Sequence, residues 1–216
     1  MKESTSREKI LKNIRNAMID KSENPYPNLD MDSPVFPDCE DSADVVFAEN
    51  FTANGGAFVY CENIGAFVEN FKLLMVQNHW APLIVLDDLI QSWFRQTGIV
   101  FFGKSDEVSL GKTSVTQCEA IIARTGSIMV SSRQKSGRSL NILPENHVVV
   151  AFTSQLFPDI KTALKEIRSS LGENMPSFIS FISGPSRTLA IEQSTVIGAH
   201  GPKTLFLFLI DDSEDL

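Results

Sequence analysis

The chain has 216 residues, of which 43% are hydrophobic and 21% charged, and its formal net charge at pH 7 is −8. This length suits one domain, or one domain with an appendage, and the hydrophobic fraction excludes intrinsic disorder for most of the chain. An acidic chain without a cluster of Lys and Arg binds phosphate backbones poorly, and no apolar run approaches the roughly 20 residues of a membrane span, so we expect neither nucleic acid nor a membrane span.

The amino-terminal segment indicates a helix followed by a linker. Apolar residues recur at helical spacing between charged ones, which predicts an amphipathic helix over residues 5–19. Four prolines in residues 20–41 favour an extended strap. We therefore expect an arm, residues 1–41, whose apolar helix face docks on a partner or on a second copy of the chain.

Neither the first residues nor the cysteines indicate an extracellular protein. The first nine residues carry both charge signs and no apolar stretch follows them, which does not suit a secretory signal. Cys39, Cys61 and Cys118 are odd in number and lack the spacing of a disulfide framework or a metal site. We expect reduced thiols and a cytoplasmic location.

From residue 42 the pattern changes to short apolar runs separated by amphipathic stretches, which is typical of α/β units around a mostly parallel sheet. This domain, residues 42–210, is followed by an acidic end, residues 211–216, that we expect to be frayed. The expected strands cover residues 57–60, 82–86, 99–102, 147–152, 178–182 and 204–210; the expected helices cover 64–79, 89–95 and 159–171, the last closed by Gly172; and a hairpin joins 120–123 to 128–131.

Common chemical motifs are absent from the sequence. It contains no dinucleotide fingerprint, phosphate loop, nucleophile elbow or HExxH motif. The three histidines, His79, His147 and His200, have no metal-ligand spacing, and no CxxC pair is present to hold iron and sulfur. We expect no metal and no cofactor bound by this chain itself.

The segment SGPSRT, residues 183–188, follows an apolar strand and forms the first candidate site. Small residues, hydroxyls and the guanidinium of Arg187 suit a carboxylate or a phosphate. An equally weighted alternative is a structural turn, with Arg187 paired to an acid such as Glu192.

Two further stretches are candidates. His200 stands between glycines before a strand, where it can donate to an oxyanion or move a proton, although a plain turn explains it as well. Residues 124–147 carry a local charge of +3, because Arg124, Arg133, Lys135 and Arg138 face only Glu145. That charge attracts an anion, or it belongs to a solvated loop. His147 opens an apolar strand and reads as a core or strand-end histidine.

Four blocks, in this order, resemble the lactate utilization domain (LUD) family, in particular its lactate utilization protein C members. They are ARTGSIMV (residues 123–130), RSLNILPENH (138–147), ISGPSRT (182–188) and GAHGP (198–202). The resemblance implies a three-layer α/β fold similar to the ribose-5-phosphate isomerase and CoA-transferase group. It also implies a role in oxidising L-lactate to pyruvate beside two partner proteins, at least one of which carries iron–sulfur clusters.

The resemblance also implies the site. His200 is the expected catalytic residue, and His147 matches the strand-start histidine of the family. The residues expected to bind a small carboxylate substrate are Thr125, Gly126, Arg138, Ser183, Gly184, Ser186, Arg187, Thr188 and Gly201.

Two positions depart from the family pattern. Arg124 replaces an acid or small polar residue, and Ala190 replaces an acid, which removes a possible base or ion-pair partner. The alternatives are therefore a free-standing protein or enzyme that binds CoA esters or sugar phosphates, and a non-catalytic structural or regulatory subunit.

Overall fold

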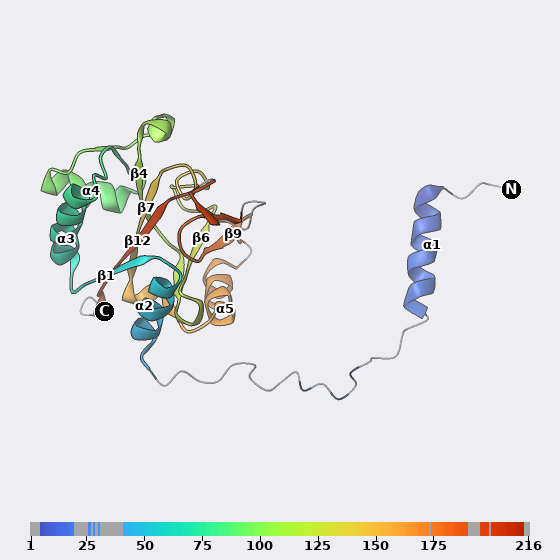
Figure 1. Cartoon of the computed structure of the whole chain (residues 1–216). Helices are drawn as coiled ribbons and strands as arrows, with labels where there is room; N and C mark the ends of the chain where they lie inside the picture. Colours follow the sequence, from blue (N-terminus) through green and yellow to red (C-terminus); the bar gives the residue numbers. More distant parts are fainter. Residues whose placement is uncertain are drawn as a thin grey trace. The chain divides into compact units, whose positions relative to one another are not determined.

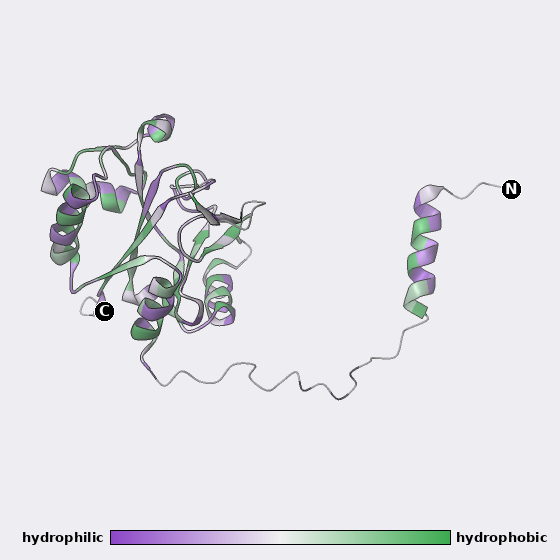
Figure 2. Cartoon of the chain, viewed as in Figure 1, coloured by the Kyte–Doolittle hydropathy of each residue, from purple (hydrophilic) through white to green (hydrophobic). Residues whose placement is uncertain are grey.

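The computed structural model describes residues 5–19, 26, 28, 30, 41–172, 174–189, 195–198 and 200–213. Most of the expected strap, residues 20–41, and also Ala190 and Glu192 lie outside the described residues. The chain divides into two units, residues 1–38 and 39–216. The first contains helix α1 (Ser6–Ile19), none of whose residues is buried. Figure 1 shows this helix, and Figure 2 shows that hydrophobic and hydrophilic residues alternate along it.

The second unit is built on a sheet of six strands. Each strand is parallel to its neighbours, which confirms the expected α/β class with a mostly parallel sheet. In spatial order the strands are β1 (Ala57–Cys61), β12 (Thr204–Ile210), β7 (Asn146–Phe152), β4 (Thr113–Gln117), β2 (Leu83–Ile84) and β3 (Phe101–Phe102).

Both faces of the central strands are buried. Val148 and Val150 of β7 pack with helices α3 (Ile64–Gln77) and α4 (Asp88–Thr97) on one face. Val149 and Ala151 pack on the other face with helix α2 (Ala43–Ala53) and with a second sheet. Figure 1 shows α3 and α4 on one side of the six strands and α2 on the other. Because both faces are buried, the sequences of the central strands are continuous apolar runs and do not alternate between apolar and polar residues.

The second sheet has four strands and adds a layer that we did not expect. It contains, in order, β8 (Leu156–Phe157), β5 (Ala120–Ile122), β6 (Ser127–Ser131) and β9 (Ile179–Ile182), and the expected hairpin is its antiparallel pair β5 and β6. Helix α5 (Ile160–Leu171) covers the outer face of this sheet. Strands β10 (Arg187–Leu189) and β11 (Thr195–Ile197) form a separate antiparallel pair. Three short 3-10 helices complete the described elements: η1 (Ser105–Leu110), η2 (Ala123–Thr125) and η3 (Thr153–Gln155).

The expectation of a frayed acidic end is wrong for residues 211–213. Tyr60 Oη donates to Asp211 Oδ2 at 2.7 Å, and Thr153 Oγ1 donates to Asp212 Oδ1 at 2.6 Å. Hydrogen bonds from Ser213 and Tyr60 lower the pKa of Asp211 to about 2. The acids after β12 therefore attach the chain to the ends of β1 and β7, while residues 214–216 lie outside the described part. No described helix combines the length and the hydropathy that crossing a membrane requires.

Candidate functional site

A cavity of about 170 Å³ lies at the edge of the sheet where β7 and β12 begin. His147 and Leu205, the second residues of these strands, are paired across the sheet and both line it. The full lining is Asn141, Ile142, His147, Ile182, Gly184, Pro185, Ser186, His200, Gly201, Pro202 and Leu205. Three of the four sequence blocks thus meet around one space, which we call the amino-edge cavity.

His147 is the most deeply placed polar residue of the amino-edge cavity. Its side chain is 0% exposed, and Nε2 lies 2.9 Å from Thr116 Oγ1 on the neighbouring strand β4. Burial lowers the pKa of His147 from 6.5 to about 4, so the imidazole is neutral at pH 7. Its buried Nδ1 has no hydrogen-bond partner among the described residues. If Nε2 donates to Thr116, Nδ1 is an acceptor, and if Thr116 donates to Nε2, Nδ1 carries the proton.

Asn141 presents a second such atom in the same lining. Asn141 Nδ2 donates to the carbonyl of Gly137 at 3.3 Å, whereas Oδ1 is buried and has no partner within the described part of the chain. A buried polar atom without a partner in the protein is costly, and such an atom normally binds a water or a ligand. Two of them in one lining indicate that the cavity receives a polar molecule.

The loops that carry Ser186 and His200 hold one another in place. Ser186 N donates to the carbonyl of Pro202, and Gly198 N donates to the carbonyl of Ser186, each at 2.9 Å. A Cβ on Gly201 would lie 2.8 Å from Ser186 Cβ, so only glycine permits this approach. His200 is exposed and lines the cavity, which places its imidazole between solvent and the interior.

Other expected site residues join helix α2 or strand β6 to the loops and do not line the cavity. The guanidinium of Arg187 donates to the carbonyl of Asn54, which follows α2. Asn54 Nδ2 donates to the carbonyl of Thr125 at 2.9 Å, and Ser183 Oγ lies 2.7 Å from Ser127 Oγ. Gly126 has φ +55°, and a Cβ there would lie 2.4 Å from the backbone of α2. These contacts explain the Thr-Gly and Ser-Gly-Pro-Ser-Arg patterns as scaffold; their ligand-binding role stays a prediction.

Thr188 and Arg138 also lie outside the lining. Thr188 is exposed on β10, paired with Val196 of β11. Arg138 is also exposed, with its guanidinium carbon 4.6 Å from the centre of the Phe178 ring, a distance typical of a cation–π contact. Sequence reasoning did not single out Asn141, although it lies within the block at residues 138–147.

Comparison with known proteins decides the family. Residues 104–210 match the model of the LUD domain. The chain carries a LUD domain over these residues. The resemblance inferred from the four sequence blocks is thereby confirmed, and the LUD domain contains every residue that lines the amino-edge cavity.

Several curated relatives match the LUD domain region. Lactate utilization protein C of Halalkalibacterium halodurans is 29% identical over 57% of this chain and 53% of its own length. Lactate utilization protein C 1 of Bacillus mycoides is 30% identical over 50% of this chain and 49% of its own. The uncharacterized protein YkgG of Escherichia coli is 34% identical over 47% of this chain and 45% of its own. The chain spans about half the length of these relatives.

A solved structure has a similar fold over a larger part of this chain than residues 104–210, which match the LUD domain. A DUF162 family protein from Deinococcus radiodurans superposes with a TM-score of 0.55 at 18% identity, covering 78% of this chain and 98% of that one. The α/β architecture around the amino-edge cavity therefore also occurs in a crystal structure.

Proposed function

We propose that this chain takes part in cytoplasmic L-lactate utilization by binding lactate or pyruvate in the amino-edge cavity. The observation that carries the proposal is the meeting of three LUD blocks around two buried, unpartnered polar atoms, Asn141 Oδ1 and His147 Nδ1. The names of the relatives from Halalkalibacterium halodurans and Bacillus mycoides supply the pathway.

The size of the cavity suits such a ligand. A water molecule in the liquid takes about 30 Å³, so a cavity of about 170 Å³ has room for about six non-hydrogen atoms, the number in lactate and in pyruvate. Ile142, Ile182 and Leu205 offer an apolar wall for the methyl group. Asn141, His147 and Ser186 offer polar atoms for the carboxylate and the hydroxyl or keto oxygen.

The two histidines have different tasks in this proposal. His147 is held by Thr116 and stays neutral, so it orients an oxygen of the ligand without carrying charge. His200 is at the solvent side and accepts the hydroxyl proton during oxidation. Conversion of L-lactate to pyruvate releases two protons and two electrons, and we assign the electrons to partner proteins that carry iron–sulfur clusters.

Helix α1 is the proposed docking arm for those partners. It exposes Ile10, Leu11, Ile14, Met18 and Ile19 on a helix with no buried residue. The basic residues of α1, Arg7, Lys9, Lys12 and Arg15, exceed its single acid Glu8, so this helix is basic in an acidic chain. An apolar face flanked by cations suits an acidic partner surface. Assembly with the partners that survives deletion of residues 1–41 contradicts this assignment.

Ligand titration of the full chain tests the proposal. Thermal unfolding is followed against L-lactate, pyruvate and, for comparison, formate, in the wild type and in Ser186→Ala and Asn141→Ala. A ligand at 100 times its dissociation constant adds about 2.7 kcal/mol to the free energy of unfolding. At about 2 to 4 °C per kcal/mol for a chain of this size, Tm rises by about 5 to 11 °C.

The matched control is Ser170→Ala on helix α5, which removes a hydroxyl outside the cavity lining. We expect the lactate or pyruvate shift in the wild type and the control, and a reduced shift in the two cavity variants. A folded wild type with no shift up to 100 mM, or equal shifts in all four proteins, overturns carboxylate binding in this cavity.

A further inference from the structure

A second cavity lies at the ends of strands β2 and β4, where the segment after β2 and the segment after β4 turn to opposite faces of the sheet. Strands β2 and β4 are adjacent and parallel. The segment after β2 enters α4, whose Ile90 and Phe94 pack on one face of the sheet. The segment after β4 continues through Cys118 to β5, where Ile121 packs on the opposite face. In open α/β sheets this divergence at the carboxyl ends of the strands leaves a crevice that binds ligands.

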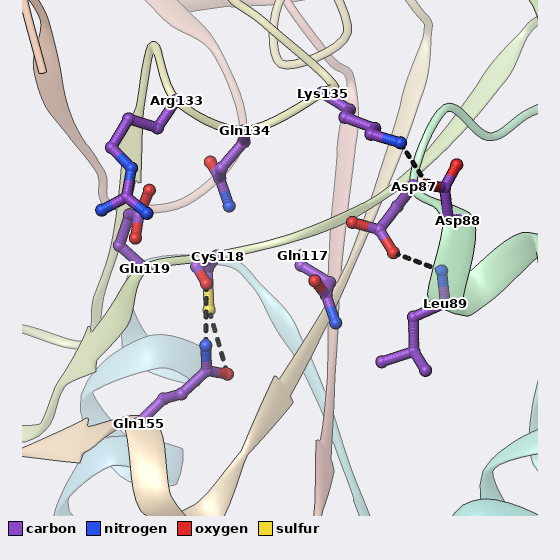
Figure 3. A pocket seen from close by; sticks show the side chains of 10 residues that line it. All are labelled: Asp87, Asp88, Leu89, Gln117, Cys118, Glu119, Arg133, Gln134, Lys135 and Gln155. Carbon is purple, nitrogen blue, oxygen red and sulfur yellow. Dashed lines mark hydrogen bonds and ion pairs between the residues drawn. The ribbon is translucent and has the colours of Figure 1, made fainter.

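The crevice contains a cavity of about 470 Å³, which we call the carboxyl-edge cavity. Figure 3 shows its side chains converging from four segments: the start of α4, the end of β4, the loop after β6 and the turn after β7. The lining residues are Asp87, Asp88, Leu89, Gln117, Cys118, Glu119, Arg133, Gln134, Lys135 and Gln155.

Some of these groups hold the walls together. Asp87 Oδ1 caps α4 by accepting from Leu89 N at 3.0 Å. Gln155 Nε2 donates to the carbonyl of Cys118 at 2.8 Å. Lys135 forms an ion pair with Asp88, which fastens the loop after β6 to the start of α4. The cavity is thus framed by contacts between segments that are far apart in sequence.

Other groups are left for a ligand. The guanidinium of Arg133 and the amide of Gln117 have no hydrogen bond or ion pair in the described part of the chain, and both line the cavity. Glu119 uses one oxygen, Oε1, to accept from Ser131 Oγ at 2.5 Å, which leaves its other oxygen. Asp87 likewise uses only Oδ1. The lining therefore combines free carboxylate acceptors with a free cation.

This set of groups narrows the ligand chemistry. Carboxylate oxygens and an amide bind hydroxyl groups, and Arg133 with the nearby ammonium of Lys135 binds an anion, for which a guanidinium is well shaped. A volume of about 470 Å³, against about 170 Å³ for the amino-edge cavity, is far larger than lactate needs. We propose that the carboxyl-edge cavity is a second ligand site and that it takes a phosphorylated sugar, with the phosphate on Arg133 and the hydroxyls on Asp87, Gln117 and Glu119.

This site is independent of the proposed lactate site. The two cavities lie at opposite ends of β7, whose seven residues span roughly 20 Å at about 3.3 Å per residue. One small molecule cannot touch both, so each site can be tested while the other is left intact.

Calorimetric titration of the full chain with glucose 6-phosphate, ribose 5-phosphate and AMP tests the second site. The unphosphorylated sugars and inorganic phosphate serve as half-ligands. We expect at least one phosphorylated sugar to bind tenfold or more tightly than either of its halves, because both kinds of group are then engaged. We expect Arg133→Gln to weaken that binding at least tenfold. Gln117→Ala should weaken it too, without changing the binding of inorganic phosphate.

The matched control is Arg168→Gln, which removes the same charge from the exposed side of α5 and should leave binding unchanged. Ser186→Ala, in the amino-edge cavity, should also leave it unchanged. Absence of binding by all three compounds overturns the proposal. So does binding that inorganic phosphate matches and Arg133→Gln does not weaken. A lactate or pyruvate shift that persists in Arg133→Gln separates failure of this site from failure of the proposed function.

Discussion

The buried, neutral state of His147 makes the stability of the protein depend on pH. Its pKa is about 4 in the folded chain and takes its ordinary value of 6.5 once the chain unfolds. Between these values the unfolded state binds the proton and the folded state does not. The contribution of His147 to the free energy of unfolding is therefore highest above pH 6.5, and it falls as the pH is lowered towards 4.

The size of this effect follows from linkage. The whole difference of 2.5 between 6.5 and 4 corresponds to about 3 kcal/mol at 1.36 kcal/mol per pKa unit. At pH 5 the unfolded imidazole is almost fully charged and the folded one almost fully neutral. The contribution of His147 is then about 2 kcal/mol lower than at pH 8. For a chain of this length, that loss lowers Tm by about 4 to 8 °C.

Urea unfolding at pH 8, 7, 6 and 5 measures the effect in the wild type and in His147→Gln. We expect the variant to lose about 2 kcal/mol less than the wild type between pH 8 and pH 5, because its side chain does not titrate. The control is His79→Asn, which removes an exposed histidine at φ +54° and should keep the wild-type slope. Parallel pH profiles for wild type and His147→Gln, or a His147 imidazole that titrates near 6.5 by NMR in the folded protein, refute the reasoning.

Three further changes probe the packing and the turns. Gly126→Ala should lower the free energy of unfolding by about 2 kcal/mol or more, because the new Cβ would lie 2.4 Å from the backbone of α2. The control is Gly137→Ala, which has a similar φ of +58° but no atom within 4 Å of the new Cβ, so it measures the conformational cost alone. Equal losses of stability in urea for the two variants would contradict the packing argument. Phe71→Ala should lower the free energy of unfolding, measured by chemical denaturation, by about 3 to 5 kcal/mol, because the buried Phe71 ring has its centre 4.8 Å from that of Phe94. The control, Val100→Ala at an 88% exposed position, should change this free energy little. Similar losses in the two variants would place Phe71 outside the core. Asp159→Ala should lower the free energy of unfolding, measured by thermal unfolding, by about 1 kcal/mol, because Asp159 Oδ1 caps α5 by accepting from Thr162 N at 2.8 Å. Asp159→Asn keeps an acceptor and should retain most of that stability. An alanine variant with unchanged stability would show that the cap contributes nothing.

Long periodic segments of the fold could be predicted from the sequence. Apolar spacing predicted a helix over residues 64–79, and α3 covers Ile64–Gln77; the helix expected over 159–171 is α5, Ile160–Leu171, closed by Gly172. These helices bury one stripe of residues, so their sequence carries the period of the structure.

Strand β4 could not be predicted, because its residues are polar. Thr113, Ser114 and Thr116 are fully buried in the middle of the sheet. They are tolerated there because their hydroxyl groups find partners: Ser114 Oγ donates to the carbonyl of Leu140 at 2.8 Å, and Thr116 Oγ1 lies 2.9 Å from His147 Nε2. A local pattern of hydrophobicity cannot anticipate partners that are 26 and 31 residues away.

Part of the lining of the amino-edge cavity could be predicted from the sequence. Ser186, His200 and Gly201 were singled out and do line one cavity. Arg187 was expected to bind a carboxylate, and this role stays a prediction; in the structure its guanidinium contacts the carbonyl of Asn54, 133 residues away. Arg133 and Lys135 of the carboxyl-edge cavity belong to the basic stretch that was expected to attract an anion, but the rest of this cavity could not be anticipated. Its walls come from segments whose proximity depends on which face each connection takes, and only the assembled sheet determines that.

The position of β12 in the sheet makes assembly of the core depend on the last described strand of the chain. Residues 204–210 follow every other described strand in the chain, yet β12 lies between β1 and β7 and pairs with both. A chain that lacks these residues has no hydrogen-bonded bridge between β1 and the other four strands of the sheet, β7, β4, β2 and β3. Its central hydrophobic surfaces stay uncovered until β12 arrives, since Leu205, Leu207 and Phe208 belong to the core on the two faces. Pairing between strands so far apart in sequence slows folding, and an intermediate without β12 exposes apolar surface that favours aggregation.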